Sequence, residues 1–190
     1  MVKATNETRL ADAALKKLAS MPWRDLTLGD VAKAAKIPLS SLQSFGGKTA
    51  LIGLILTRFG AETAARYVPE KDATAKDRVL EAAMTWFEIN AKRKPAIRSL
   101  YDGLKFDPLT LLAQREHFAT AAGWLLTLAQ ADTGAAPGLR SLGFAAIMAR
   151  AIGVWLEDDA DMLATMARLD GDLSRAEDFL RPRAKPADED

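Results

Sequence analysis

Apolar residues recur at three- and four-residue spacing along nearly the whole chain, and no segment shows the strict alternation that marks a β-strand. In the first part of the chain this spacing predicts helices over 6–20, 28–35, 39–45 and 48–67. Prolines, paired glycines and small polar loops separate five further predicted helices, over 75–93, 95–105, 109–131, 138–157 and 160–180. The pattern therefore predicts an all-α protein of about nine helices.

The predicted helices fall into two groups. Three short helices with a tight turn between the second and the third have the layout of a helix-turn-helix module, which we assign to residues 1–47. Thr27 is the expected N-cap of the second helix, with Asp30 three residues on as a variant of the capping box. We assign 48–180 to a helical bundle that begins with a connecting helix over 48–67, and 181–190 to a flexible tail.

Residue types exclude several kinds of chemistry. The 190 residues contain no cysteine and one histidine. A disulfide framework, a thiolate zinc site and a cysteine nucleophile are therefore excluded. The GGKT segment at 46–49 lacks the remainder of a P-loop, and EDDAD at 157–161 lacks the glycine turn of a calcium loop. We therefore expect no metal, no cofactor and no enzymatic activity.

Hydropathy along the chain indicates where the protein resides. The longest apolar run, over 143–156, is broken by Arg150, so we expect no stable membrane insertion. The first residues are charged and lack the apolar core of a signal peptide. These features predict a cytoplasmic protein.

The charges are distributed unevenly. Residues 1–60 carry nine Lys/Arg against four Asp/Glu, a net charge of +5, whereas the remaining 130 residues carry a net charge of −4. A basic N-terminal module favours a polyanionic partner, and nucleic acid is one candidate.

The third helix of the module carries the side chains that would read base edges. Gln43 has the amide geometry for a bidentate pair with adenine. Lys48 stands at a helix start, where a cation does nothing for the helix dipole, so we expect it to contact phosphate. The predicted DNA-contacting residues are Thr27, Lys33, Lys36, Ser40, Ser41, Gln43, Ser44 and Lys48, with Lys3 and Arg9 adding positive charge.

The segment TLGDVAKAAKIPLSSLQSFGGKTALIGLIL resembles the N-terminal DNA-binding domain of TetR-type transcriptional regulators over about residues 6–60. The rest of the chain has the length and all-helical character of that family. Two departures stand out: Lys36 occupies a turn position where the family usually has glycine, and the third helix is one residue short and carries no Lys or Arg. The resemblance implies a TetR-like fold and a homodimer that binds a palindromic operator. It also implies a repressor role that a small hydrophobic or amphipathic effector relieves.

The same resemblance implies an effector pocket between the helices of the C-terminal bundle. Its expected liners are Trp86, Tyr101, His117, Phe118 and Trp124. Tyr101 and His117 would orient a polar group in otherwise apolar surroundings.

The last two helices have the pattern of an association surface. Small residues permit close backbone approach in the first of them, and an apolar stripe follows the second, although part of each stripe must cover its own subunit's core. The expected interface residues are Gly143, Ala146, Ala149, Gly153, Met162, Met166, Leu169 and Leu173.

A second, shorter resemblance leaves an alternative function open. The segment VWLEDDADMLATMARLD is similar to a TetR-fold branch that binds lipids in ubiquinone biosynthesis, which implies a lipid- or isoprenoid-binding accessory protein with a vestigial helix-turn-helix. Eight acidic residues and only Arg168 and Arg175 occur between positions 157 and 180. An anionic membrane surface would repel such a helix.

Overall fold

The computed structural model describes residues 5–132 and 136–180, and these form helices and turns without a strand. The predicted tail over 181–190 lies outside the described residues. The all-α fold is confirmed. The α-helices are α1 (Asn6–Leu18), α2 (Leu28–Ala35), α3 (Ala50–Arg66), α4 (Ala75–Asn90), α5 (Lys94–Leu104), α6 (Pro108–Ala113), α7 (Arg115–Leu128), α8 (Pro137–Glu157) and α9 (Leu163–Leu180). Three short 3₁₀ helices join them: η1 (Trp23–Asp25), η2 (Leu39–Leu42) and η3 (Ala91–Arg93).

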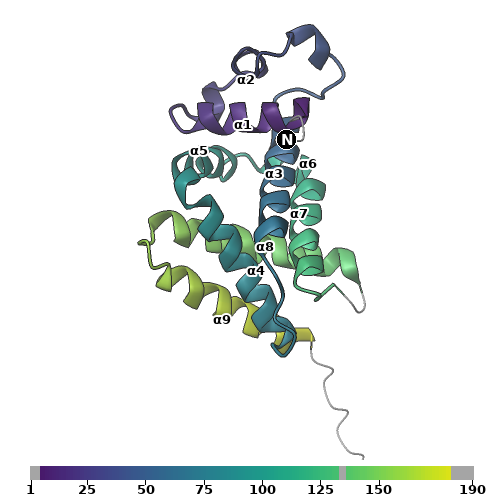
Figure 1. Cartoon of the computed structure of the whole chain (residues 1–190), viewed down its shortest axis with the longest axis vertical. Helices are drawn as coiled ribbons and strands as arrows, with labels where there is room; N and C mark the ends of the chain where they lie inside the picture. Colours follow the sequence, from purple (N-terminus) through teal and green to yellow (C-terminus); the bar gives the residue numbers. More distant parts are fainter. Residues whose placement is uncertain (1–4, 133–135, 181–190) are drawn as a thin grey trace, which may run out of the picture.

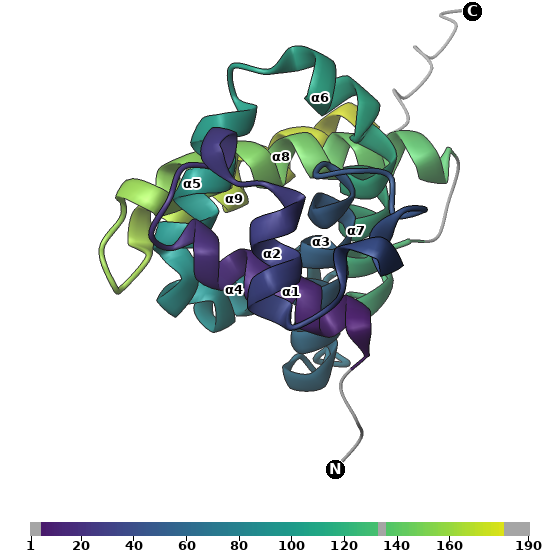
Figure 2. The same ribbon diagram turned by 90° about the horizontal axis from the view of Figure 1, so that it is seen from above.

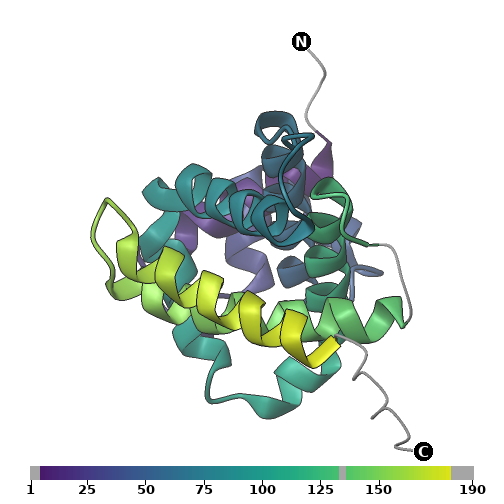
Figure 3. The ribbon, with the colours of Figure 1, turned by 90° about the horizontal axis from the view of Figure 1, so that it is seen from below.

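The helices divide the molecule into a small N-terminal head and a larger body (Figure 1). The head contains α1, η1, α2 and η2. Helix α3 leaves the head and runs into the body, where it packs against α7 and α4. Figure 2 looks onto the head, and Figure 3 shows α8 and α9 side by side on the opposite face of the body.

The core of the head is apolar and continuous with that of the body. Leu10, Ala14 and Leu18 lie on the buried face of α1, and Val31 of α2 is fully buried with them. Their three- and four-residue spacing produced the helical prediction, because such residues share one face of a helix.

Four aromatic side chains from α3, α4 and α8 form the centre of the body. Trp86 makes edge contacts with Phe59 and Phe87 at ring-centroid distances of 5.5 and 5.0 Å. Trp155 lies 5.3 Å from Phe87 and is fully buried. Edge-to-face packing of this kind contributes beyond area burial, so these residues are structural.

Helix α5 joins the body to the head. The Ser99 hydroxyl donates to the Met21 carbonyl at 2.8 Å. The Trp23 side chain sits against Gly103, where an added Cβ would lie 2.7 Å from Trp23 Cβ. Only glycine permits this approach, so the Trp23 side chain of η1 packs directly on the backbone of α5.

The prediction of one unbroken helix over 109–131 is wrong. The chain forms α6 and α7, separated at Gln114, whose φ of −97° and ψ of 5° end the first of them. The apolar face of α7 packs against α3 and α8, whereas α6 buries none of its residues and projects from the body (Figures 2 and 3).

Candidate nucleic-acid interface

Helix α2 begins with the capping box that the sequence predicts. The Thr27 side chain accepts from the Asp30 backbone N–H at 3.1 Å, and the Asp30 carboxylate accepts from the Thr27 backbone N–H at 3.2 Å. The Thr27 hydroxyl also donates to Asp30 at 2.5 Å, and these bonds lower the pKa of the Asp30 carboxyl. The hydroxyl is therefore committed to a carboxylate, which disfavours the phosphate contact expected for Thr27.

The turn after α2 places Lys36 in the left-handed region, at φ 55° and ψ 45°. The Ile37 N–H donates to the Ala32 carbonyl at 2.9 Å and the Lys36 N–H donates to the Lys33 carbonyl at 3.1 Å, a Schellman arrangement that ends the helix. The Arg9 guanidinium donates to the Ala35 and Lys36 carbonyls from α1. The turn is therefore fixed although a non-glycine residue occupies it.

The helix predicted over 39–45 is instead a single 3₁₀ turn, η2, followed by a turn to Gly46. Leu42 is buried and anchors this segment, while Ser40, Ser41, Gln43 and Ser44 are all exposed. Glycine residues at φ 86° and 84°, Gly46 and Gly47, then turn the chain into α3. The polar side chains are thus presented to solvent, on a shorter element than expected.

Lys48 binds within the head. Its Nζ donates to the Trp23 carbonyl at 3.0 Å and to the Arg24 carbonyl at 3.3 Å, and it lies 4.8 Å from the centroid of the Trp23 ring. We expected the Lys48 ammonium to be free for phosphate; in this structure it is instead bound to backbone carbonyls. The sequence did not indicate this partner because Lys48 and Trp23 are 25 positions apart.

Lys33 and Lys36 are the predicted cationic contacts whose side chains are exposed. Within residues 5–132 and 136–180 neither forms an ion pair. Together with the serines and Gln43 they leave the turn and η2 as the polar, cationic surface of the head.

The five predicted effector liners do not share one cavity. Trp86 belongs to the buried aromatic cluster, His117 is exposed beside Gly53, and Phe118 is half-buried. Trp124 is 44% exposed, and its indole N–H donates to the Gly60 carbonyl at 3.2 Å. His117 and Trp124 lie against the glycines Gly53 and Gly60 of α3, and Tyr101 lines the cleft between α5, α8 and α9.

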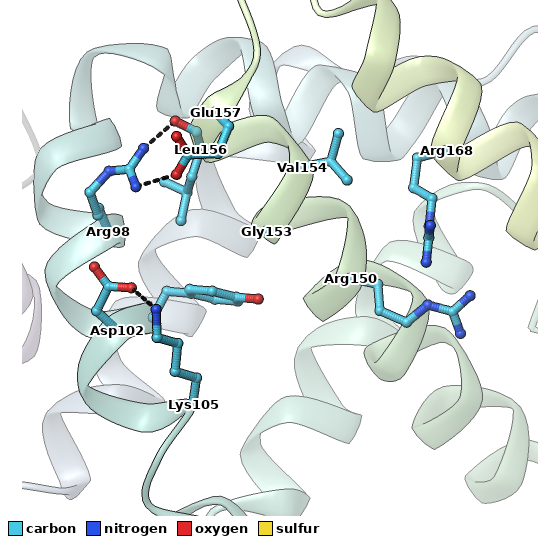
Figure 4. Close-up of a pocket in the computed structure, with 10 residues that line it drawn as sticks. Arg98, Asp102, Lys105, Arg150, Gly153, Val154, Leu156, Glu157 and Arg168 are labelled. Carbon is cyan, nitrogen blue, oxygen red and sulfur yellow. Dashed lines mark hydrogen bonds and ion pairs between the residues drawn. The ribbon is translucent and has the colours of Figure 1, made fainter.

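That cleft lies between α5, α8 and α9, and its volume is about 540 Å³ (Figure 4). Its lining is largely charged: Arg98, Lys105, Arg150 and Arg168 with Asp102 and Glu157. None of these residues was among the predicted liners. Basic residues within otherwise apolar helices, such as Arg150, were the sequence feature that could have indicated this cleft.

The predicted association surface divides into exposed and buried parts. Helix α8 is long and apolar enough to cross a membrane by length and composition alone, although core helices of soluble proteins share these properties. Within its most apolar 18-residue stretch, 28% is buried. Gly143, Ala146 and Ala149 are exposed, and Gly143 has open space around it. Gly153 instead lies against Tyr101, whose hydroxyl oxygen would be 2.7 Å from an added Cβ.

Two interface assignments on α9 are wrong. Leu169 is fully buried and Leu173 is 9% exposed, because both pack into their own subunit's core. Met162 precedes α9 and has a φ of 54°, so it is not part of the helical stripe. Met166 is 43% exposed and remains available.

Solved structures share this arrangement of a small N-terminal head on an all-helical body. A TetR transcriptional regulator from Nitrosomonas europaea ATCC 19718 matches 92% of this chain and 99% of its own with a TM-score of 0.66 and 17% identity. The TetR family repressor AlkX from Dietzia sp. strain DQ12-45-1b, implicated in biodegradation of n-alkanes, matches 92% and 96% with a TM-score of 0.55 and 18% identity. A TetR-family regulator from Streptomyces coelicolor matches 98% and 94% with a TM-score of 0.54 and 18% identity.

The chain therefore has the fold of TetR-family transcriptional regulators over nearly its whole length, as the sequence resemblance implied. No protein-family model and no curated protein matches the sequence.

Proposed function

We propose that the chain is a homodimeric, DNA-binding transcriptional regulator of the TetR type, acting as a repressor that a small-molecule effector releases. The observation that carries the proposal is the head: after a capped α2 and a fixed turn, η2 and the turn that follows it expose Ser40, Ser41, Gln43 and Ser44 to solvent. The fold likeness to TetR regulators supports the same function.

The side chains of the head differ in chemistry, and we assign them different roles in DNA binding. Lys33 and Lys36 supply charge for phosphate, which positions the protein without reading sequence. Gln43 supplies an amide that discriminates between base edges. Lys48 holds η1 to the start of α3 through its bonds to Trp23 and Arg24.

The exposed face of α8 supports the homodimer, because a second copy would cover it. Leu142 is 44% exposed, and the small residues Gly143 and Ala146 follow at helical spacing, so the face is apolar and permits close approach of a partner helix. Two heads in one dimer would meet a palindromic operator at half-sites about 34–36 Å apart. An effector that alters the separation of the heads would weaken that binding.

Helix α5 offers the route from effector to head. One face lines the charged cleft through Arg98, Tyr101 and Asp102, and the other contacts the head through Ser99 and Gly103. A shift of α5 would act on Trp23, and through Trp23 on Lys48.

Binding assays with two variants test the function. We expect Gln43→Ala to cost about 1–3 kcal/mol on the operator and little on unrelated DNA. We expect Lys33→Ala to weaken binding to all DNA similarly and to lower the salt slope by about one unit. Equal effects of both variants on all sequences would contradict sequence reading by Gln43.

One observation favours a second function, lipid binding with an unused head. Helix α6 and its approach expose a group of large apolar side chains: Phe106 and Leu109 are 81% and 79% exposed, and Leu112 is 61% exposed. Vesicle co-sedimentation of the full chain, together with failure to bind any DNA fragment, would support this function over the first.

A further inference from the structure

The cleft between α5, α8 and α9 has an excess of positive charge. Four of its side chains are cationic, namely Arg98, Lys105, Arg150 and Arg168, and two are carboxylates, Asp102 and Glu157. This gives the lining a net charge of +2 within a part of the chain, residues 61–190, whose net charge is −4. In Figure 4, Arg98, Asp102 and Lys105 lie on one side, and Arg150 and Arg168 lie on the other.

The two sides differ in how their charges are balanced. Arg98 is paired with Glu157, and Lys105 is paired with Asp102 at 2.6 Å, so the α5 side is neutral overall. On the other side no carboxylate of the lining faces Arg150 or Arg168. The excess charge therefore sits on these two guanidiniums, from α8 and α9.

A buried carboxylate holds these guanidiniums in place. The side chain of Asp172 is 2% exposed and accepts from Arg150 at 2.7 Å, from Arg168 at 3.0 Å and from Arg175 at 2.8 Å. One carboxylate cannot neutralise three guanidiniums, and each keeps N–H donors beyond the one that Asp172 accepts. Arg150 and Arg168 are 51% and 40% exposed, so these donors are accessible from the cleft.

We propose that the cleft binds the oxyanion of a small molecule, a carboxylate or a phosphate, between Arg150 and Arg168. Guanidinium groups bind these oxyanions through paired, charge-assisted hydrogen bonds, and prior fixing by Asp172 reduces the ordering that binding requires. The volume of about 540 Å³ exceeds what the anion alone needs, so an organic body fits beside Tyr101, Val154 and Leu156. Anion binding here does not require that the head binds DNA.

Calorimetric titration of the full chain, at constant ionic strength in chloride, tests the site with inorganic phosphate and with succinate as probes. We expect one probe or both to bind wild-type protein, and the preferred probe distinguishes phosphate from carboxylate. Arg150→Gln should weaken binding about tenfold or more. Arg168→Gln, on α9, should weaken binding similarly, and it replaces Arg150→Gln in the test if that variant does not fold.

Arg175→Gln is the matched control. It also removes an ion pair with Asp172, but Arg175 does not line the cleft, so binding should equal that of wild-type protein. Absence of binding of either probe to wild-type protein would overturn the site. Equal weakening by Arg175→Gln would also overturn it, because the loss would then follow from the Asp172 cluster and not from cleft charge.

Discussion

Replacement of Lys36 by glycine should stabilise the protein. Lys36 occupies the left-handed region at φ 55° and ψ 45°, where a residue with a Cβ is about 1–2 kcal/mol less stable. Glycine removes this strain but loses more conformational freedom on folding, at a cost of about 0.5–1 kcal/mol. The lysine side chain is exposed and makes no ion pair with any described residue, so its removal costs little. The net expected gain is roughly 0.5–1 kcal/mol.

Thermal unfolding followed by circular dichroism measures this gain. For a chain of this size, 0.5–1 kcal/mol corresponds to a rise in Tm of about 1–4 °C. Lys36→Ala is the control, because it also removes the charge but keeps the Cβ and therefore the strain. If Lys36→Gly and Lys36→Ala unfold at the same temperature, the left-handed backbone at this position does not destabilise the protein, and the reasoning is refuted.

Burial and charge yield two further predictions. Leu169→Ala should lower the free energy of unfolding, measured with denaturant, by about 2–5 kcal/mol without changing self-association. Ala146→Glu should instead yield folded monomers in sedimentation, because Ala146 lies on the exposed face of α8. A folded, dimeric Ala146→Glu variant would exclude the exposed face of α8 as the interface. The hydrogen bond from Arg93 holds the pKa of Glu62 below its usual value, so the stability that Glu62 contributes is present above about pH 4.3 and is lost as pH falls through the lower, folded-state pKa. The difference in unfolding free energy between wild type and Glu62→Gln should therefore shrink toward pH 2, and a difference independent of pH would contradict this role.

Local signals predicted the head well up to the turn. Thr27 and Asp30 are three residues apart and cap α2 by themselves, so the helix begins and ends where the sequence indicates. η2 was less predictable, because its few residues form either a 3₁₀ turn or an α-helix according to how Leu42 is anchored in the core. The partner of Lys48 depends on the tertiary position of Trp23, which local spacing does not encode.

In the body, periodicity identified helices but not what each face contacts. The α9 stripe is apolar at helical spacing, yet Leu169 and Leu173 face their own core while Met166 is exposed. The aromatic residues expected around an effector instead fill the centre of the bundle, as Trp86 does. The charged cleft depends on α5, α8 and α9 lying together and on Asp172 pairing with Arg150 and Arg168, whereas each of these arginines alone resembles an ordinary surface residue.

The most direct test of a DNA-binding regulator compares binding of the wild-type protein to the DNA upstream of its own gene with its binding to a shuffled fragment of equal length and composition. The measurement is made at two salt concentrations, so that the charge-dependent, sequence-independent part of the affinity is separated from base reading. We predict tighter binding to the upstream fragment at both, with protection of two half-sites about one helical turn apart. Equal affinity for the two fragments at both salt concentrations would contradict a reading head, and would leave the fold with a function other than operator recognition.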